Sequence, residues 1–256
     1  MTVEPLDLPA QEQWEERFRV PVYETDIHQQ IKVSSFFRLM ELGAQHHADN
    51  LRVSNEDMLR LGQSWVLSRT KLILHRLPRS EEWITWRTWP KGFSQKIFFA
   101  RDFEFLDDEG EILAQATSSW IIFDLKSRRM VPSTAMKLDF PVNTARHAIA
   151  EDLQKIAAPV TMEPVYQLQA RFSSLDELHH VNNARYVDWA LDAFPYEFHR
   201  ENMPASLQIN FLNEVRPEER LELLKGQTTD GGWVICGERL PGREKAFEVS
   251  VSWKPR

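Results

Sequence analysis

The sequence predicts an α+β protein built from two similar units, each an antiparallel sheet curled around one long helix. The first observation is a repeat: residues 175–186 match residues 25–36 without a gap, which aligns Asp176 with Asp26 and Tyr186 with Phe36. The second observation is that each copy has a strand-like run before it and a helix-like stretch after it. A repeat of this length indicates a duplicated domain and not a short solenoid unit.

In the first unit, residues 18–23 alternate apolar with other side chains and predict a short strand. Ser34 or Ser35 is then a suitable N-cap for a helix that runs to about Asn50. The apolar stripe of this helix is formed by Phe36, Phe37, Met40 and Ala44. Strand-like runs follow at 64–74, 83–89, 95–106 and 112–124, with turn signals at 77–80 and 107–110.

Residues 141–165 interrupt this pattern with three prolines. They also include an alanine-rich segment, 148–158, that we predict to be a short helix. We therefore place the first domain at residues 1–145, a linker at 146–164 and the second domain at 165–256.

The second unit repeats the order of the first. A strand is predicted at 167–173, and a helix at 184–194, where Pro195 limits its length. Further strands are predicted at 206–215, 219–228, 232–239 and 245–254.

The composition is that of a soluble globular protein, with 256 residues, 42% hydrophobic and 27% charged. A net charge of −7 argues against nucleic acid as a partner, and no apolar run approaches the roughly 18 residues of a membrane span. The first residues carry no secretory signal, and the single cysteine, Cys236, fits a reducing compartment. We therefore expect a cytoplasmic protein.

The second copy of the repeat carries a polar cluster of Asp176, His179, His180, Asn182 and Asn183. The first copy keeps the Asp, but it has Gln30 in place of the second His and Lys32-Val33 in place of the two Asn residues. This asymmetry predicts one working site on a two-part scaffold. His46-His47 and His179-His180 are adjacent pairs, which is not the spacing of two metal ligands on one helix face, so we expect no metal.

The cluster suits acyl-transfer chemistry at the start of a helix. Asp176 can act as a general base on water or attack as a carboxylate, and His180 can transfer protons near neutral pH. The N–H groups of the helix N-terminus suit a developing oxyanion. Structural roles remain as alternatives: Asp176 as a turn residue, His180 as a loop histidine bonded to the backbone, His179 as an exposed side chain, and Asn182 or Asn183 as helix caps.

The motif Asp-x-x-x-His-Val-Asn-Asn-x-x-Tyr, followed by a helix and strands, resembles the hot-dog fold thioesterases. Two such units in one chain resemble the acyl-acyl carrier protein (acyl-ACP) thioesterases of plants and bacteria. Other segments that carry the resemblance are 64–71, 110–121, 126–129 and 210–214. The resemblance implies two tandem hot-dog domains, of which the first shapes the acyl pocket and the second carries the catalytic groups.

The resemblance implies specific site residues. The catalytic Asp, His and Glu of that family match Asp176, His180 and Glu214, and we expect Glu214 to lie on a strand. Leu178 stands at the position of a family Asn, and Val215 at that of a family Cys.

The implied activity is release of a free fatty acid from acyl carrier protein, without a metal or an organic cofactor. The carrier is acidic, and the best docking candidates are Lys126, Arg128 and Arg129. Hydrolysis of acyl-CoA on the same scaffold is an alternative. A weakly active acyl-binding or carrier-binding module is another, because Leu178 removes a polar group. The protein could be a monomer or a homodimer.

Overall fold

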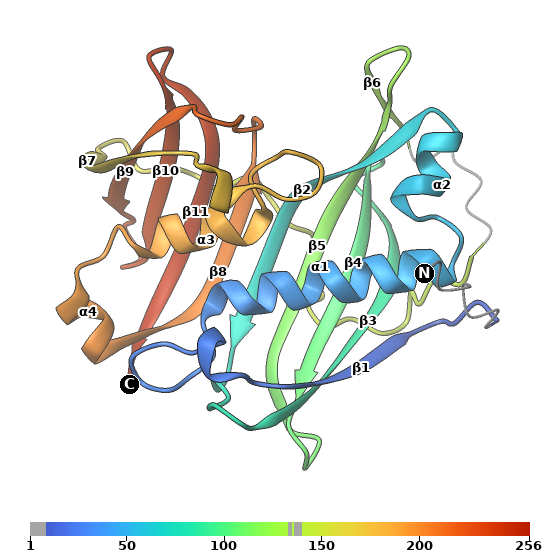
Figure 1. Cartoon of the computed structure of the whole chain (residues 1–256), viewed down its shortest axis with the longest axis horizontal. Helices are drawn as coiled ribbons and strands as arrows, with labels where there is room; N and C mark the ends of the chain where they lie inside the picture. Colours follow the sequence, from blue (N-terminus) through green and yellow to red (C-terminus); the bar gives the residue numbers. More distant parts are fainter. Residues whose placement is uncertain (1–8, 133–134, 136–139) are drawn as a thin grey trace.

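The computed structural model describes residues 9–132, 135 and 140–256. Within them, eleven strands form one continuous sheet, and two long helices lie side by side against one of its faces (Figure 1). The strand order is β1-β3-β4-β5-β2-β8-β11-β10-β9-β7, with β6 paired to β5. No helix among the described residues has both the length and the apolar composition needed to cross a membrane.

The first half of the sheet comes from the N-terminal part of the chain. Its helices are α1 (Val33–Asn50) and α2 (Asn55–Arg60), and a short 3-10 turn, η1 (Val22–Glu24), precedes them. Its strands are β1 (Trp14–Arg19), β2 (Gln63–Leu74), β3 (Trp83–Ser94), β4 (Phe98–Leu106), β5 (Ile112–Asp124) and β6 (Arg129–Val131). The predicted first strand at 18–23 was therefore placed too late. Neither Ser34 nor Ser35 caps α1, because the N-cap position is Lys32.

The second half repeats this order. It contains η3 (Phe172–Ser174), α3 (Asn183–Leu191) and α4 (Tyr196–Glu201). Its strands are β7 (Glu163–Gln169), β8 (Asn202–Phe211), β9 (Arg220–Gln227), β10 (Trp233–Leu240) and β11 (Glu244–Pro255). The aligned residues Phe36 and Tyr186 are both buried, and each packs against a phenylalanine of the sheet. Phe36 packs edge-on against Phe105 at 4.8 Å between ring centroids, and Tyr186 against Phe247 at 5.1 Å.

The two halves join through the middle of the sheet and through their helices. Strand β2 pairs with β8 from Arg69 to Ile73, and α1 packs against α3. Apolar side chains from both halves form one buried cluster between the helices and the sheet. The halves therefore share a hydrophobic core.

The connection between the halves crosses the outer face of the sheet as an extended strap (residues 141–160). Its backbone is held by side chains of the strands: Asp102 accepts from Ala148 N at 2.8 Å, and Arg69 donates to Leu153 O. Because these backbone groups bond to the sheet and not to one another, no helix forms at 148–158, and that prediction was wrong. The strap explains why β4 is buried along its whole length.

The division at residue 145 stays a proposal, and it can be tested with a fragment. We expect residues 1–145 alone to self-associate, because the fragment would expose the edge of β2 that pairs with β8 and the side of α1 that packs on α3. Light scattering measures this, and addition of residues 146–256 should restore a one-to-one complex. A monodisperse monomeric fragment would contradict the shared core.

Candidate active site

The loop between β7 and α3 is organised by the carboxylate of Asp176. Its Oδ1 accepts hydrogen bonds from the backbone N–H groups of Leu178, at 2.9 Å, and of His180, at 3.0 Å. The side chain is partly buried, and no described residue donates a hydrogen bond to its second oxygen, Oδ2. One oxygen therefore holds the loop, while the other remains available for a substrate or a water molecule.

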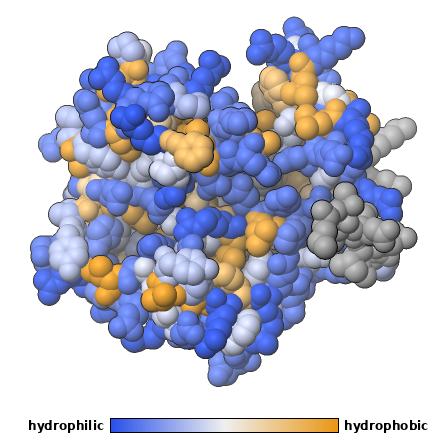
Figure 2. Space-filling model, in the orientation of Figure 1, coloured by the Kyte–Doolittle hydropathy of each residue, from blue (hydrophilic) through white to orange (hydrophobic). Residues whose placement is uncertain are grey.

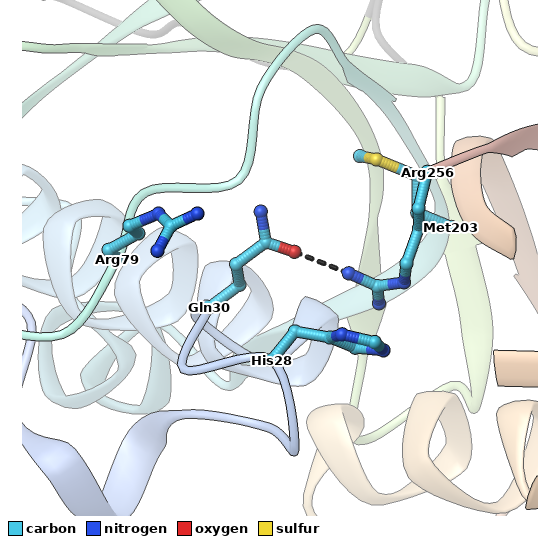
Figure 3. A pocket seen from close by; sticks show the side chains of 5 residues that line it. All are labelled: His28, Gln30, Arg79, Met203 and Arg256. Carbon is cyan, nitrogen blue, oxygen red and sulfur yellow. Dashed lines mark hydrogen bonds between the residues drawn. The ribbon is translucent and has the colours of Figure 1, made fainter. Parts of the chain in front are cut away.

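The first copy of the repeat has the same loop but a different electrostatic environment. Asp26 Oδ1 accepts from the backbone N–H groups of His28 and Gln30, while Asp26 Oδ2 is 3.2 Å from the guanidinium of Arg256. Arg256 also donates to the side chain of Gln30, in a pocket that His28, Arg79 and Met203 complete (Figure 3). The guanidinium of Arg256 balances the negative charge of the Asp26 carboxylate. The Asp176 carboxylate has no such partner among the described residues, so the two copies of the repeat differ in charge.

His180 and Glu214 meet beside the Asp176 loop. His180 Nε2 lies 3.2 Å from Glu214 Oε1, and both side chains are about half exposed. The sequence predicted that Glu214 lies on a strand, and this prediction was wrong. Glu214 lies in the loop that follows β8. Strand β8 ends at Phe211 because the next two N–H groups, of Leu212 and Asn213, both donate to Ala246 O. A carboxylate at this distance can hold the imidazole in one orientation.

Tyr186 and Val215 tie the Glu214 loop to helix α3. Val215 is fully buried, and its backbone hydrogen-bonds to the hydroxyl of Tyr186. Burial, together with the nearby carboxylates of Glu214 and Asp176, raises the pKa of Tyr186 well above its ordinary value. The tyrosine therefore remains protonated and acts as a structural anchor between the two loops of the site.

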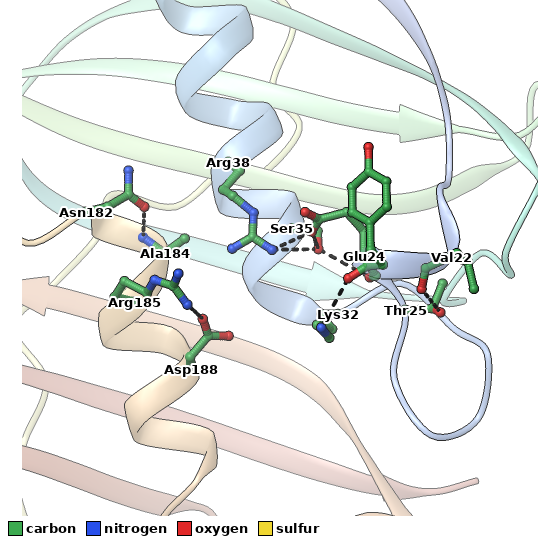
Figure 4. A network of polar contacts seen from close by, with 11 residues as sticks. Val22, Glu24, Thr25, Lys32, Ser35, Arg38, Asn182, Ala184, Arg185 and Asp188 are labelled. Atoms are coloured by element: carbon green, nitrogen blue, oxygen red, sulfur yellow. Dashed lines mark hydrogen bonds and ion pairs between the residues drawn. The ribbon is translucent and has the colours of Figure 1, made fainter. Parts of the chain in front are cut away.

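Asn182, Asn183 and His179 have three different settings. Asn182 caps α3, since its Oδ1 accepts from Ala184 N at 3.0 Å (Figure 4). Its other side-chain atom, Nδ2, donates to Glu41 Oε2 on helix α1 at 3.0 Å. Asn183 is the first residue of α3 and is partly buried. His179 is exposed and has a left-handed backbone, with a φ angle of 63°.

A narrow, mostly apolar pocket lies between α1 and the sheet of the first half, next to the start of α3. Glu41 and Asn183 are the polar groups on its α3 side. The other lining residues are Phe37, Met40, Leu67, Thr70, Phe103, Ser118 and Trp120. The pocket thus brings apolar side chains of the first half next to the polar loop of the second half.

Glu41 was missed at the sequence level. It follows Phe37 by one helical turn and precedes Ala44, so it is a charged residue on the apolar stripe of α1. Burial raises the pKa of the Glu41 carboxyl, and the charges of Asp176 and Glu177 raise it further. The hydrogen bond from Asn182 lowers this pKa and offsets part of the rise. A charge within an apolar stripe was the signal that could have identified it.

Family models match nearly the whole chain. The acyl-ACP thioesterase N-terminal domain matches residues 11–135, and the acyl-ACP thioesterase C-terminal domain matches residues 158–254. Together with the observed sheet and helices, these matches confirm the predicted α+β fold of two tandem hot-dog units.

Several known proteins are similar to this chain. A chloroplastic palmitoyl-acyl carrier protein thioesterase from Cuphea hookeriana is 25% identical, over all of this chain and 66% of the relative. A chloroplastic acyl-[acyl-carrier-protein] hydrolase from Cuphea viscosissima is 24% identical, over 94% of this chain and 62% of the relative. This chain therefore spans somewhat less than two thirds of the length of these curated relatives.

Solved structures agree with the fold. An acyl-ACP thioesterase from Bacteroides thetaiotaomicron has a TM-score of 0.86 at 20% identity, covering 95% of this chain and 98% of the other. The 12:0-ACP thioesterase from Umbellularia californica has a TM-score of 0.78 at 19% identity, covering 96% and 98%. At these identities the likeness concerns the fold alone.

Proposed function

This chain belongs to the acyl-ACP thioesterase family, and we propose that it hydrolyses a fatty acyl thioester on acyl carrier protein to the free fatty acid and the carrier thiol. The observation that carries this proposal is the placement of a carboxylate with one unbonded oxygen, that of Asp176, at the start of α3. It lies beside the His180–Glu214 pair and close to an apolar pocket.

The proposed reaction divides the work between the two halves. The apolar pocket of the first half holds the acyl chain, and the backbone N–H of Asn183, the first residue of α3, stabilises the negative oxygen that forms on the carbonyl. The next two N–H groups, of Ala184 and Arg185, already donate to Asn182. Asp176 binds and orients the attacking water or attacks the carbonyl itself, and His180, held by Glu214, assists proton transfer. The carbon–sulfur bond then breaks, and the leaving thiolate takes up the proton that the water gives up. If Asp176 is the nucleophile, water hydrolyses the resulting mixed anhydride, which releases the fatty acid and regenerates the carboxylate.

A free-thiol release assay on acyl-ACP substrates of graded chain length tests this proposal. We expect turnover of at least one chain length above the uncatalysed rate. Equal or faster turnover of the matching acyl-CoA substrates would make the protein an acyl-CoA thioesterase. Tight acyl-ACP binding without turnover would instead indicate a binding module, in which Leu178 has replaced a needed polar group.

The carrier-docking surface that we propose is the tip of the hairpin between β5 and β6. Lys126, Arg128 and Arg129 are exposed there, together with Leu125 and Met130, which are 46% and 53% exposed. Figure 1 draws this hairpin as a projection at the top of the molecule, above the level of the loop before α3, and Figure 2 shows hydrophobic side chains beside hydrophilic ones on this projection. Basic and apolar groups together suit a partner that is acidic and presents an acylated prosthetic arm.

Charge reversal tests this surface. We expect Arg128→Glu and Arg129→Glu each to raise KM for acyl-ACP several-fold, because they replace attraction to the acidic carrier by repulsion. The effect should weaken at high salt, where exposed charges are screened. The matched control is Arg200→Glu on α4, which should leave KM unchanged.

Steady-state kinetics on the two carriers separates docking from folding. Short acyl-CoA substrates should react at the wild-type rate with Arg128→Glu and Arg129→Glu, since they do not use the hairpin. An equal loss on acyl-ACP and acyl-CoA would contradict a docking role for these arginines.

A further inference from the structure

Glu41 carries a carboxylate that links the apolar pocket of the first half to the polar loop of the second. It lines the pocket together with Asn183, and its Oε2 accepts from Asn182 Nδ2 at 3.0 Å. Asn182 cannot turn its amide around, because its own Oδ1 already accepts from Ala184 N at the start of α3. Glu41 is thereby fixed beside the helix N-terminus, where an oxyanion would form.

A purely structural role does not require a carboxylate at this position. Asn182 needs only an acceptor for its N–H group, and a glutamine oxygen would serve equally well. A charged group that is partly buried in an apolar pocket carries a cost that a neutral amide avoids. No described residue other than Asn182 donates a hydrogen bond to the Glu41 side chain, which leaves Oε1 free to accept from water.

We propose that Glu41 is a second catalytic carboxylate of this site and acts as the general base on the attacking water. This role rests on the proposed thioester hydrolysis. Glu41 Oε1 takes one proton of the water, and the water oxygen bonds to the thioester carbon while the carbonyl electron pair moves to the oxygen. The tetrahedral carbon then expels the carrier sulfur as a thiolate. The thiolate takes up the proton from Glu41, which yields a free fatty acid and a thiol.

The surroundings of Glu41 favour a group that changes its protonation state during the reaction. Its pKa is raised by burial, by Asp176 and by Glu177, and it is lowered by the hydrogen bond from Asn182. The other residues that line the pocket are uncharged, so Asp176 and Glu177 are the titratable groups that face it. A raised pKa brings a carboxylate closer to the operating pH, which makes it a better base.

The test is the pH profile of kcat/KM for acyl-ACP hydrolysis by the full chain. The wild type should lose activity as the pH falls, because Glu41 becomes protonated. Glu41→Gln keeps the acceptor for Asn182 but removes the base, so we expect kcat/KM to fall by about a hundredfold. The residual kcat/KM should also lack the acidic limb of the profile, which is the fall in activity at low pH. The matched control is Glu56→Gln on α2, whose side chain is 78% exposed and which should behave as wild type.

Two further variants should move the acidic limb in opposite directions. Asn182→Ala removes the hydrogen bond that lowers the pKa of Glu41, so the limb should move to higher pH. Asp176→Asn removes a charge that raises this pKa, so the limb of its residual activity should move to lower pH. A residue that merely supported the fold would change the rate without these opposite shifts.

The outcomes separate this inference from the proposed function. If the wild type hydrolyses acyl-ACP and Glu41→Gln keeps both its rate and its acidic limb, Glu41 is not the base. An unmoved limb in Asn182→Ala leads to the same conclusion, even if Glu41→Gln fails to fold. A wild type that hydrolyses neither acyl-ACP nor acyl-CoA overturns the proposed function, and the role of Glu41 with it.

Discussion

Asp176→Asn should lower kcat for thioester hydrolysis by about a hundredfold or more, while the thermal unfolding midpoint changes little. The asparagine oxygen can still accept from the backbone N–H groups of Leu178 and His180, so the loop before α3 keeps its shape. The variant removes only the negative charge and the unbonded carboxylate oxygen. Steady-state hydrolysis of acyl-ACP, measured beside thermal unfolding of the same preparation, checks both halves of this expectation.

The repeat supplies the matched control for this variant. Asp26→Asn makes the same chemical change in the same loop geometry, but at a carboxylate that is already paired with Arg256. We expect it to leave kcat unchanged. If Asp176→Asn retained full activity, the carboxylate at the start of α3 would serve the loop alone. If both variants lost activity equally, the effect would come from the loops and not from one site.

The repeat could be predicted in detail because its geometry is local. Asp176 bonds to N–H groups two and four residues later, and Asp26 does the same in its own copy. Such bonds depend on a few neighbouring residues, so two similar sequences give two similar loops. The left-handed residues Gln29 and His179, with φ angles of 59° and 63°, show how closely the backbones agree.

The parts that escaped prediction depend on contacts between segments distant in sequence. Residues 148–158 of the strap have the composition of a short helix, but the side chains of Asp102 and Arg69 bind the strap's backbone and keep it extended. Propensity is a weak guide where tertiary partners of this kind exist. The same holds for Arg256, whose pairing with Asp26 joins positions 230 residues apart.

The site was predicted unevenly for the same reason. The helix start, with Asp176 and His180, follows from one short motif. The approach of Glu214 to His180 depends on where β8 ends, and the approach of Glu41 to Asn182 depends on how α1 packs against α3. The sequence can indicate such residues only indirectly, as Glu41 does by interrupting an apolar stripe.

His47 is a buried histidine of α1 that should make the fold sensitive to acid. It is fully buried, its Nε2 donates to Gln11 O at 2.9 Å, and its Nδ1 accepts from the guanidinium of Arg101 at 3.0 Å. Only the bond from Arg101 requires the neutral ring, because a protonated imidazole can still donate to Gln11 O but cannot accept at Nδ1. Burial, together with the charge of Arg101, lowers the pKa of His47 from 6.5 to about 4.

Because the folded protein lowers this pKa, neutral His47 contributes its full stabilisation above pH 6.5. This stabilisation is lost as the pH falls towards 4. In that window the unfolded chain binds a proton at His47 and the folded chain does not, which favours unfolding by up to about 3 kcal/mol.

His47→Gln offers an oxygen to Arg101 and an N–H to Gln11 but does not titrate. We therefore expect its stability deficit relative to wild type to shrink by about this amount between pH 7.5 and 4. Urea unfolding at a series of pH values measures the difference, and the exposed His75, changed to Gln, is the control. A deficit that stays constant across this range would mean that His47 does not remain neutral in the folded protein.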